Sequence, residues 1–208
     1  MDDIKQSMRE ILQAESRAIL GIPVTDAYEK AVEAIVEHVH HRRGKLVTSG
    51  MGKAGQIAMN IATTFSSTGT AAVNLHPSEA QHGDLGVIQP DDIILLISNS
   101  GKTREILELV DLLQRLYDNH VPVIVITGNP DSPLARLADI ALFTAPVPEV
   151  CPLGLTPTTS TTMMTVIGDV LVVSVMKCIG FSREEYAKRH HGGYLGLEAR
   201  KSDKTVVA

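Results

Sequence analysis

Two short, uninterrupted apolar runs constrain the fold of this chain more than any other feature. Ile93 to Ser98 reads Ile-Ile-Leu-Leu-Ile-Ser, and Val121 to Thr127 is similarly apolar. Runs of this length without polar alternation are typical of strands that are buried on both faces. Helical patterns separate such runs along the chain, and this alternation predicts a parallel sheet with helices on both faces.

We predict an α/β fold with a five-stranded parallel sheet, arranged as a flavodoxin-like three-layer sandwich and preceded by N-terminal helices. The expected strands are Leu46–Ser49, Ala71–Leu75, Ile93–Ser98, Val121–Thr127 and Ile140–Thr144. The expected helices are Asp3–Leu20, a second from about Asp26 to Gly44, one after Gly55, Thr103–Tyr117, a short one at Ser132-Pro133, a long one ending at Gly180, and a last one between Ser182 and Gly192-Gly193.

Local signals refine the ends of these helices. Asp26 with Glu29, and Ser182 with Glu185, have the spacing of capping boxes. We expect His38, His40 and His41 to face solvent, and the polar tail beyond Gly196 to be loosely ordered. The whole chain, 1–208, reads as one domain with a helical segment 1–44, an α/β core 45–180 and a C-terminal helix and tail 181–208.

Composition excludes several classes of protein. The 208 residues carry a formal charge of −5 and contain only two cysteines, Cys151 and Cys178. The acidic balance argues against nucleic acid as a partner, and the cysteine count excludes a disulfide framework and favours the cytoplasm. The apolar stretch Met163–Ile179 is short and contains charges, so we expect no membrane helix. The N-terminus lacks a secretory pattern.

The first candidate loop follows the first strand. Ser49, Gly50 and Gly52 precede Lys53, which opens a helix. Glycines let backbone N–H groups approach an anion, and the helix terminus adds a positive dipole. The loop is not a nucleotide P-loop, and the acidic partner of a dinucleotide fingerprint is missing near Leu75. Phosphate binding and a plain strand-to-helix turn both remain open.

Two further loops are rich in hydroxyl groups. Ser98, Asn99, Ser100 and Thr103 follow a buried strand and open a helix. One hydroxyl suffices to cap a helix, so the surplus favours a phosphate monoester held without a metal. The run from Thr158 to Thr162 enters the long helix, and some of its hydroxyls are expected to cap it while others reach a ligand.

Histidines and acids near the strand ends are candidates for proton transfer. His76 and His82 share one loop with two acids, a cluster that could bind a divalent metal but fits no standard zinc spacing. His190 and His191 end the last helix, where interaction with the helix dipole is the alternative role. The remaining candidate acids and bases are Glu105 and Glu149.

Together these residues resemble the sugar isomerase (SIS) domain family and, within it, the arabinose-5-phosphate isomerases. The resemblance runs from about residue 5 to residue 197. The matching stretches are Gly50-Met51-Gly52-Lys53, Ser66-Ser67-Thr68-Gly69-Thr70, His76-Pro77-Ser78-Glu79-Ala80-Gln81-His82-Gly83-Asp84-Leu85-Gly86, Ile97-Ser98-Asn99-Ser100-Gly101 and Cys151-Pro152-Leu153-Gly154-Leu155-Thr156-Pro157-Thr158. The stretch Ile97-Ser98-Asn99-Ser100-Gly101 marks a sugar-phosphate domain in general. The run from His76 to Gly86 and the run Cys151-Pro152-Leu153-Gly154-Leu155 are more specific to the arabinose-5-phosphate isomerases.

The resemblance implies interconversion of ribulose 5-phosphate and arabinose 5-phosphate through an enediolate, without a cofactor, for Kdo supply to lipopolysaccharide or capsule. It places catalysis on Lys53, Glu105, Glu149 and His190. Phosphate contacts fall on Ser98, Ser100 and Thr103, and further substrate contacts fall on Gly69, Thr70, His76, His82 and the neighbouring residues Ser49, Gly50, Gly52, Asn99, Thr158 and His191. The only metal implied is an inhibitory zinc at His82.

Three positions depart from the family pattern. Lys102 stands where an acid is usual, His191 replaces a proline after the catalytic histidine, and Ala54 replaces a serine. Which of Glu105, Glu149 and His190 is the base stays open, as does the choice between His190 and His191. The CBS modules common in the family do not follow this domain, so we expect a single-domain isomerase.

The resemblance also implies partners. Family members form homotetramers whose active sites lie at subunit interfaces, so we expect His190 to act on a neighbour's substrate. CMP-Kdo is the candidate feedback ligand. The rival interpretations are an isomerase of a hexulose or heptulose phosphate and a non-catalytic sugar-phosphate sensor. The residues before the first strand are too few and not basic enough for the DNA-binding domain that such sensors carry.

Overall fold

The five predicted strands form one parallel sheet. The computed structural model describes residues 2–117 and 120–200. The strands are β1 (Leu46–Gly50), β2 (Ala72–Asn74), β3 (Ile93–Ile97), β4 (Val123–Thr127) and β5 (Ile140–Phe143). Their order is β2-β1-β3-β4-β5 with every neighbouring pair parallel, as expected for a flavodoxin-like sheet. The prediction of the fold class is therefore confirmed.

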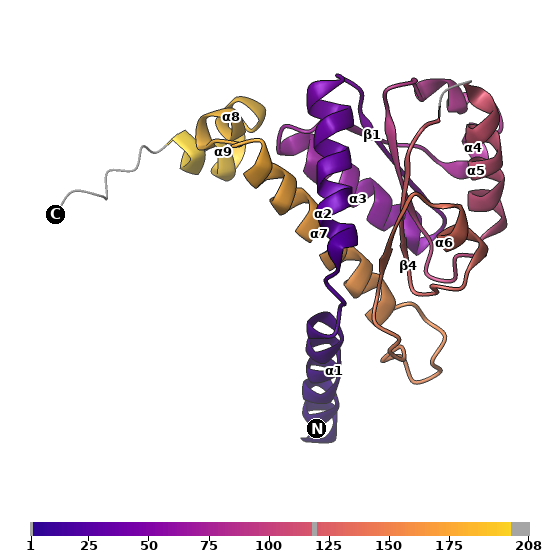
Figure 1. Ribbon diagram of the computed structural model, residues 1–208. Coiled ribbons are helices and arrows are strands. Elements are labelled where there is room, and N and C mark those ends of the chain that lie inside the picture. The colour runs from indigo at the N-terminus through magenta and orange to yellow at the C-terminus, as the bar shows by residue number, and fades with distance from the viewer. Residues whose placement is uncertain (1, 118–119, 201–208) are drawn as a thin grey trace.

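Helices cover both faces of the sheet and give the chain two apolar cores (Figure 1). Alternate residues of β3 point in opposite directions, so that Leu95 belongs to one core and Leu96 to the other. On the first face lie α2 (Asp26–Ile35), α3 (Lys53–Ser67) and α7 (Thr159–Cys178). On the second lie α4 (Pro77–Ala80), α5 (Arg104–Leu116) and α6 (Pro133–Leu137). Burial on both faces explains why the strands show no polar alternation.

The end of the second predicted helix differs from the expectation. Thr25, not Asp26, is the N-cap of α2, and its hydroxyl accepts a hydrogen bond from the N–H of Ala27. The helix continues as a π-helical turn, η1 (Val36–His41). That turn buries His38, whose Nδ1 lies 2.9 Å from the carbonyl oxygen of Asp91. It also half-buries His40, so only His41 faces solvent as predicted.

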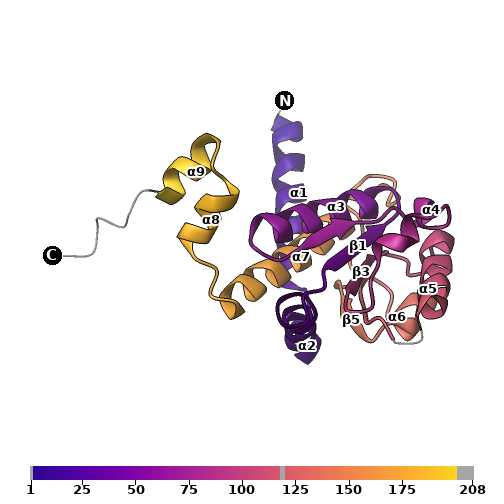
Figure 2. The same cartoon turned by 90° about the horizontal axis from the view of Figure 1, so that it is seen from above.

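The two ends of the chain project from the sandwich (Figures 1 and 2). Helix α1 (Asp2–Leu20) touches α7 near its own C-terminal end, and its residues 3–13 are all exposed. At the other end, α8 (Arg183–Arg189) and α9 (Gly193–Arg200) pack against each other beyond the end of α7. The helix predicted between Ser182 and Gly192-Gly193 is α8, which ends at Arg189, but it is not the last one: Gly193 begins α9, and the expected loose tail is helical up to Arg200. Residues 201–208 of that tail lie outside the described residues.

Helix α7 is the longest apolar helix among those that pack on the first face of the sheet. It is, within the described part of the chain, the one helix long and apolar enough to cross a membrane. One side of it is buried against the sheet and α3 through Met164, Ile167 and Leu171. Gly168 packs so closely against Ile61 of α3 that a Cβ there would lie 2.4 Å from a side-chain carbon. These contacts identify α7 as a core helix.

Candidate active site

A crevice opens where β1 and β3 end side by side. These strands are neighbours, but α3 leaves β1 toward one face of the sheet and α5 leaves β3 toward the other. Such a switch point is where α/β sheets bind ligands. The cavity measures about 410 Å³. It is lined by Met51, Lys53, Ala54, Ile97, Ser98, Asn99, Ser100, Thr103, Pro157, Ser160, Thr161 and Met164.

The loop after β3 supplies most of the hydroxyl groups. Thr103 is the N-cap of α5, yet its hydroxyl pairs with Ser98 Oγ at 2.9 Å instead of capping the helix backbone. Ser100 Oγ accepts the N–H of Lys102. Neighbouring strand β4 holds the loop in place, because the carbonyl of Asn99 accepts the N–H of Gly128 at 3.0 Å. Ser98, Ser100 and Thr103 thus line the crevice at the N-terminus of α5, and the side chain of the N-cap Thr103 does not cap the helix.

The loop after β1 brings a cation to the same crevice. Lys53 is the first residue of α3, and it is exposed. Gly52 before it has φ of +59°, which favours glycine, and a Cβ on Gly50 would lie 2.6 Å from the carbonyl oxygen of Ala54. Ser49 is fully buried and donates its hydroxyl to the carbonyl of Leu75. The structure therefore uses the side chain of Ser49 to hold β1 beside the residue after β2, and Ser49 is not among the residues that line the crevice.

Glu149 lies behind the crevice, at the N-terminus of α7. Its carboxylate accepts hydrogen bonds from the N–H and hydroxyl of Thr158 at 2.7 and 2.9 Å, and from the hydroxyl of Ser160. Burial raises the pKa of Glu149, but the hydrogen bonds from Ser160 and Thr158 outweigh burial and hold the pKa below its usual value. Because Ser160 also lines the crevice, it connects this ionised carboxylate to the ligand cavity.

Sequence reasoning selected Thr158 from the hydroxyl run but missed Ser160 and Thr161. Thr158 serves Glu149, whereas Ser160, Thr161 and Met164 line the crevice. The positions 160, 161 and 164 share one face of a helix, which was the available signal. The expectation that hydroxyls of this run cap the helix is wrong: Thr158, the N-cap of α7, makes no side-chain cap bond. The carboxylate of Glu149 accepts the N–H groups of Thr158 and Ser160 instead.

Other candidates at this edge of the sheet lie outside the lining of the crevice. His76 occupies the N-cap position of α4 without a side-chain cap bond, His82 follows α4, and both are exposed on the segment after β2. Glu105 is in the first turn of α5 and half-buried. Among the described residues, no group of three histidines, cysteines or acids is placed to hold a metal ion.

Gly69 and Thr70 lie at the opposite edge of the sheet, before β2. Thr70 is almost fully buried, and its hydroxyl is 3.0 Å from Nε2 of His40. Gly69, with φ of +94°, packs against the ring of Phe181, which a Cβ would approach to 2.7 Å. Within one chain these two residues stand apart from the crevice.

His190 and His191 lie even farther from the crevice than Gly69 and Thr70. Helix α7 starts at the crevice and runs 20 residues, about 30 Å, before α8 begins beyond its far end (Figures 1 and 2). His190 stacks on Tyr186, with ring centroids 3.8 Å apart, and its Nδ1 lies 3.1 Å from the carbonyl of that residue. A carbonyl only accepts, so Nδ1 carries the hydrogen and Nε2 of the neutral ring is left as the basic atom. The structure does not bring this base to the crevice of its own chain.

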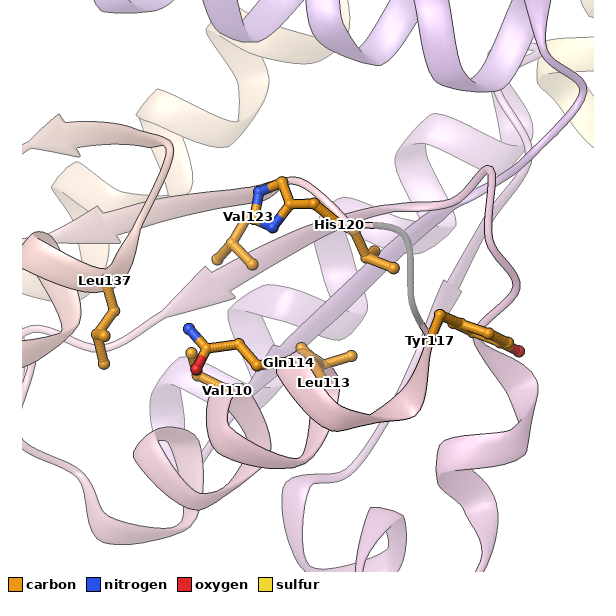
Figure 3. Close-up of a pocket in the computed structure, with 8 residues that line it drawn as sticks. Val110, Leu113, Gln114, Tyr117, His120, Val123 and Leu137 are labelled. Atoms are coloured by element: carbon orange, nitrogen blue, oxygen red, sulfur yellow. The ribbon is translucent and has the colours of Figure 1, made fainter.

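Another, smaller cavity is lined by residues of α5 and of the amino end of β4 (Figure 3). It measures about 190 Å³ and lies between α5 and the start of β4. Its lining mixes aliphatic side chains, among them Val110 and Leu113, with Gln114, Tyr117 and His120, and His120 pairs with Asp139 at 2.8 Å. It offers no counterpart to the hydroxyl-rich loops, so the crevice is the better candidate for a phosphorylated ligand.

Comparisons with known proteins identify the family to which this chain belongs. Residues 39–174 match the family model described as the SIS domain. The chain is 45% identical over 204 residues to arabinose 5-phosphate isomerase KdsD of Salmonella typhi, and 44% identical over 195 residues to KdsD of Escherichia coli K12. These alignments cover 97% and 93% of this chain, but only 60% and 58% of the relatives. The chain thus spans about three fifths of the length of these curated relatives.

Solved structures are similar over nearly the whole chain. A candidate phosphosugar isomerase involved in capsule formation from Bacteroides fragilis is 67% identical, with a TM-score of 0.90, covering 92% of this chain and 99% of that one. The protein c3406 of Escherichia coli CFT073, solved in complex with arabinose 5-phosphate, is 34% identical, with a TM-score of 0.79, covering 90% and 95%. A phosphoheptose isomerase from Francisella tularensis, at 20% identity, shares the fold alone.

Proposed function

Since this chain belongs to the SIS domain family, we propose that it is an aldose–ketose isomerase interconverting D-ribulose 5-phosphate and D-arabinose 5-phosphate. The observation that carries the proposal is the crevice between β1 and β3, where the Ser98–Thr103 pair, Ser100 and Lys53 converge. The relatives named for this reaction, and the one solved with arabinose 5-phosphate, supply the choice of substrate.

The phosphate binds at the N-terminus of α5. Hydroxyls of Ser98, Ser100 and Thr103 donate to its oxygens, and the helix dipole favours its charge. Without a ligand, Ser98 and Thr103 satisfy each other. Binding exchanges that bond for two bonds to an anion, which are shorter and stronger than bonds between neutral groups. The site therefore needs no metal to hold the phosphate.

The reaction moves one proton between C1 and C2. A base removes the proton from the carbon beside the carbonyl, the electrons form an enediolate, and the proton returns to the other carbon. Lys53 lines the crevice and supplies the positive charge that stabilises the developing oxyanion. Glu149, held ionised by Thr158 and Ser160, is suited to move the hydroxyl proton through Ser160. Glu105 and His190 are the two candidates for the carbon base.

His190 reaches the crevice of another subunit in this proposal. The α8–α9 segment projects beyond the far end of α7, and it presents Tyr194, Leu195 and Leu197 to solvent. Exposed apolar side chains on a projecting segment favour a protein contact. Gly69 lies against Phe181, at the start of this segment, so Gly69, Thr70 and His190 would be delivered to a neighbour together. A homotetramer with shared sites satisfies all of these placements.

The first test is incubation with ribulose 5-phosphate, with and without a chelator. We expect the pentose 5-phosphate aldose to form at the same rate in both, and one solvent deuterium to enter at C2. Lys53→Ala should lower turnover at least about tenfold, as loss of one charge-stabilising group does, and Lys30→Ala, at an exposed position of α2, is the matched control. Turnover only of a hexulose or heptulose phosphate, or binding of sugar phosphates without turnover, would select a rival function.

Mixing separates shared sites from self-contained ones. Lys53→Ala and His190→Ala chains should each be nearly inactive, yet recover activity when they are unfolded, mixed and refolded together. In a two-fold pair, half of randomly mixed dimers are hybrids, and each hybrid keeps one intact site, so about a quarter of normal activity should return. No recovery would exclude delivery of His190 in trans.

The finer assignments belong to the same proposal. We place the enzyme in the cytoplasm, in supply of the aldose for lipopolysaccharide or capsule, without nucleic acid or membrane as a partner. Exposed His82 is the position for inhibitory zinc, and CMP-Kdo is the feedback ligand to test. A rate unchanged by millimolar CMP-Kdo would remove that ligand from the proposal.

A further inference from the structure

The first three turns of α1 have no cover in the structure. Residues 3–13 are all exposed, although Ile4, Met8, Ile11 and Leu12 form one apolar stripe along the helix. Leu12 is 69% exposed. An isolated helix of this length is marginal in water, and most helices gain their stability from packing an apolar face. The stripe therefore needs a surface to pack against.

A groove of matching character lies between α2 and α7. It measures about 620 Å³ and is lined with apolar side chains that include Val24, Val32 and Val170. Val24 is 80% exposed and Val170 is 42% exposed, so both sides of the groove offer apolar surface. Tyr28 also lines it, only 7% exposed, and in the described part of the chain its hydroxyl finds no hydrogen-bond partner. A buried hydroxyl without a partner favours an occupant that supplies an acceptor.

The charges of the two surfaces are complementary. Asp26, Glu29 and Glu33 line the groove in one row along α2. On α1, Lys5 and Arg9 are one helical turn apart and border the stripe on the side of Leu12. An apolar stripe with a basic edge fits an apolar groove with an acidic edge, and opposite charges set the direction of docking.

The helix cannot fill the groove of its own chain. Ala18 of α1 is buried, and Glu15 accepts a hydrogen bond from the hydroxyl of Thr159, the first residue of α7. These contacts hold the base of α1 at one end of α7 while its free turns point away from the body (Figure 1). Only four residues separate Gly21 from the start of α2. The stripe is thus presented outward, to another molecule.

We propose that residues 3–13 of α1 form an arm that docks in the α2–α7 groove of a second copy of this chain. In a two-fold pair each subunit gives one arm and receives one, so the buried surface is doubled and approaches the size of a stable interface. The arm surface is separate from the α8–α9 segment that carries His190. The inference does not rest on the proposed reaction, and its readouts are contacts between chains, not turnover.

Cysteine cross-linking tests the docking directly, because native Cys178 lines the groove. In a Cys151→Ser chain, Cys178 is the single remaining thiol. We expect a cysteine at Ile4, Met8 or Leu12 to form an oxidised dimer, and Cys178→Ser to abolish it. Gln6→Cys, on the opposite side of the arm, is the matched control.

Three outcomes would overturn the proposal. A dimer that survives Cys178→Ser means that arms pair with each other. Equal cross-linking from position 6 means that the contact is random collision. Absence of cross-linking from all three stripe positions, in a chain that sediments as an oligomer, means that another surface holds the copies together.

Charge reversal gives an independent test in a chain that keeps both of its native cysteines. Arg9→Glu should weaken association about tenfold or more in sedimentation across a dilution series, because it faces like charges at the groove. Glu33→Lys in the same chain should restore at least half of the lost association free energy. Gln13→Glu, on the far side of the arm, should leave association unchanged. Weakening by Arg9→Glu that Glu29→Lys and Glu33→Lys both fail to relieve would place the arm elsewhere.

Discussion

Replacing Gly101 tests whether the phosphate loop is preformed by its packing. This glycine has φ of +61°, and an added Cβ would lie 2.1 Å from Oγ and 2.4 Å from Cβ of Ser132. The left-handed backbone alone makes Gly101→Ala about 1–2 kcal/mol less stable. Ser132 is fully buried and caps α6 by accepting the N–H of Ala135, and displacing this cap adds about 1 kcal/mol. The sum is about 2–3 kcal/mol, or about 4–12 °C in Tm for a chain of this size.

Gly154 offers a control for the backbone contribution. Its φ is +64°, almost that of Gly101, but no atom lies within 4 Å of an added Cβ. Gly154→Ala should therefore lose only about 1–2 kcal/mol. Urea unfolding of both variants measures the difference. Equal losses would refute the argument that Ser132 packs the loop. Gly101→Ala should also raise KM for the sugar phosphate more than it changes kcat at saturation, because the displaced loop carries the phosphate contacts.

Three further predictions concern single groups outside that loop. Hydrogen bonds from Thr156 lower the pKa of Cys151 to about 6, so its alkylation by iodoacetamide in a Cys178→Ser chain should rise with pH through a midpoint near 6. A midpoint at the ordinary thiol value of about 8.5 would contradict this. Burial lowers the pKa of His40, so below about pH 6.5 the unfolded chain binds more protons than the folded one. The free energy of unfolding should therefore decrease as the pH falls through that range. In His40→Gln, the slope of the unfolding free energy against pH should be smaller. Asp92 is 1% exposed and accepts hydrogen bonds from the backbone N–H and the ammonium of Lys45. In urea unfolding, Asp92→Ala should therefore destabilise the fold by about 3–5 kcal/mol. A loss under about 1 kcal/mol would show that this pair does not stabilise the fold.

The sheet was predictable because its strands are buried on both faces. A run such as Ile93–Ile97 has no polar residue to accommodate, and the order of helices and strands then restricts the topology. The crevice followed from the same logic, because parallel strands end at one edge and bring Lys53, Ser98 and Thr103 together. These predictions depend on local pattern and general topology alone.

What the sequence did not reveal depends on contacts between distant segments. His38 and His40 look like surface histidines on a helix, but His38 is buried and His40 half-buried, because the π-helical turn meets Asp91 and Thr70. The hydroxyl of Ser49 is taken by Leu75, which no motif indicates. His190 is far from the crevice because α7 runs away from it. Sequence periodicity predicts the length of such a helix, but it does not predict the direction in which the helix leaves the sheet.

The floor of the crevice has a consequence for how ligands can be found. Ile97 and Met164 line the cavity and also belong to the apolar cluster that joins the sheet to α7. A molecule bound there touches the same side chains that hold the fold together, so the melting temperature must rise as the crevice is occupied. At a hundred times its Kd such a molecule adds about 2.7 kcal/mol to unfolding. Melting curves recorded over a panel of phosphorylated sugars would rank them by affinity before any catalytic assay exists.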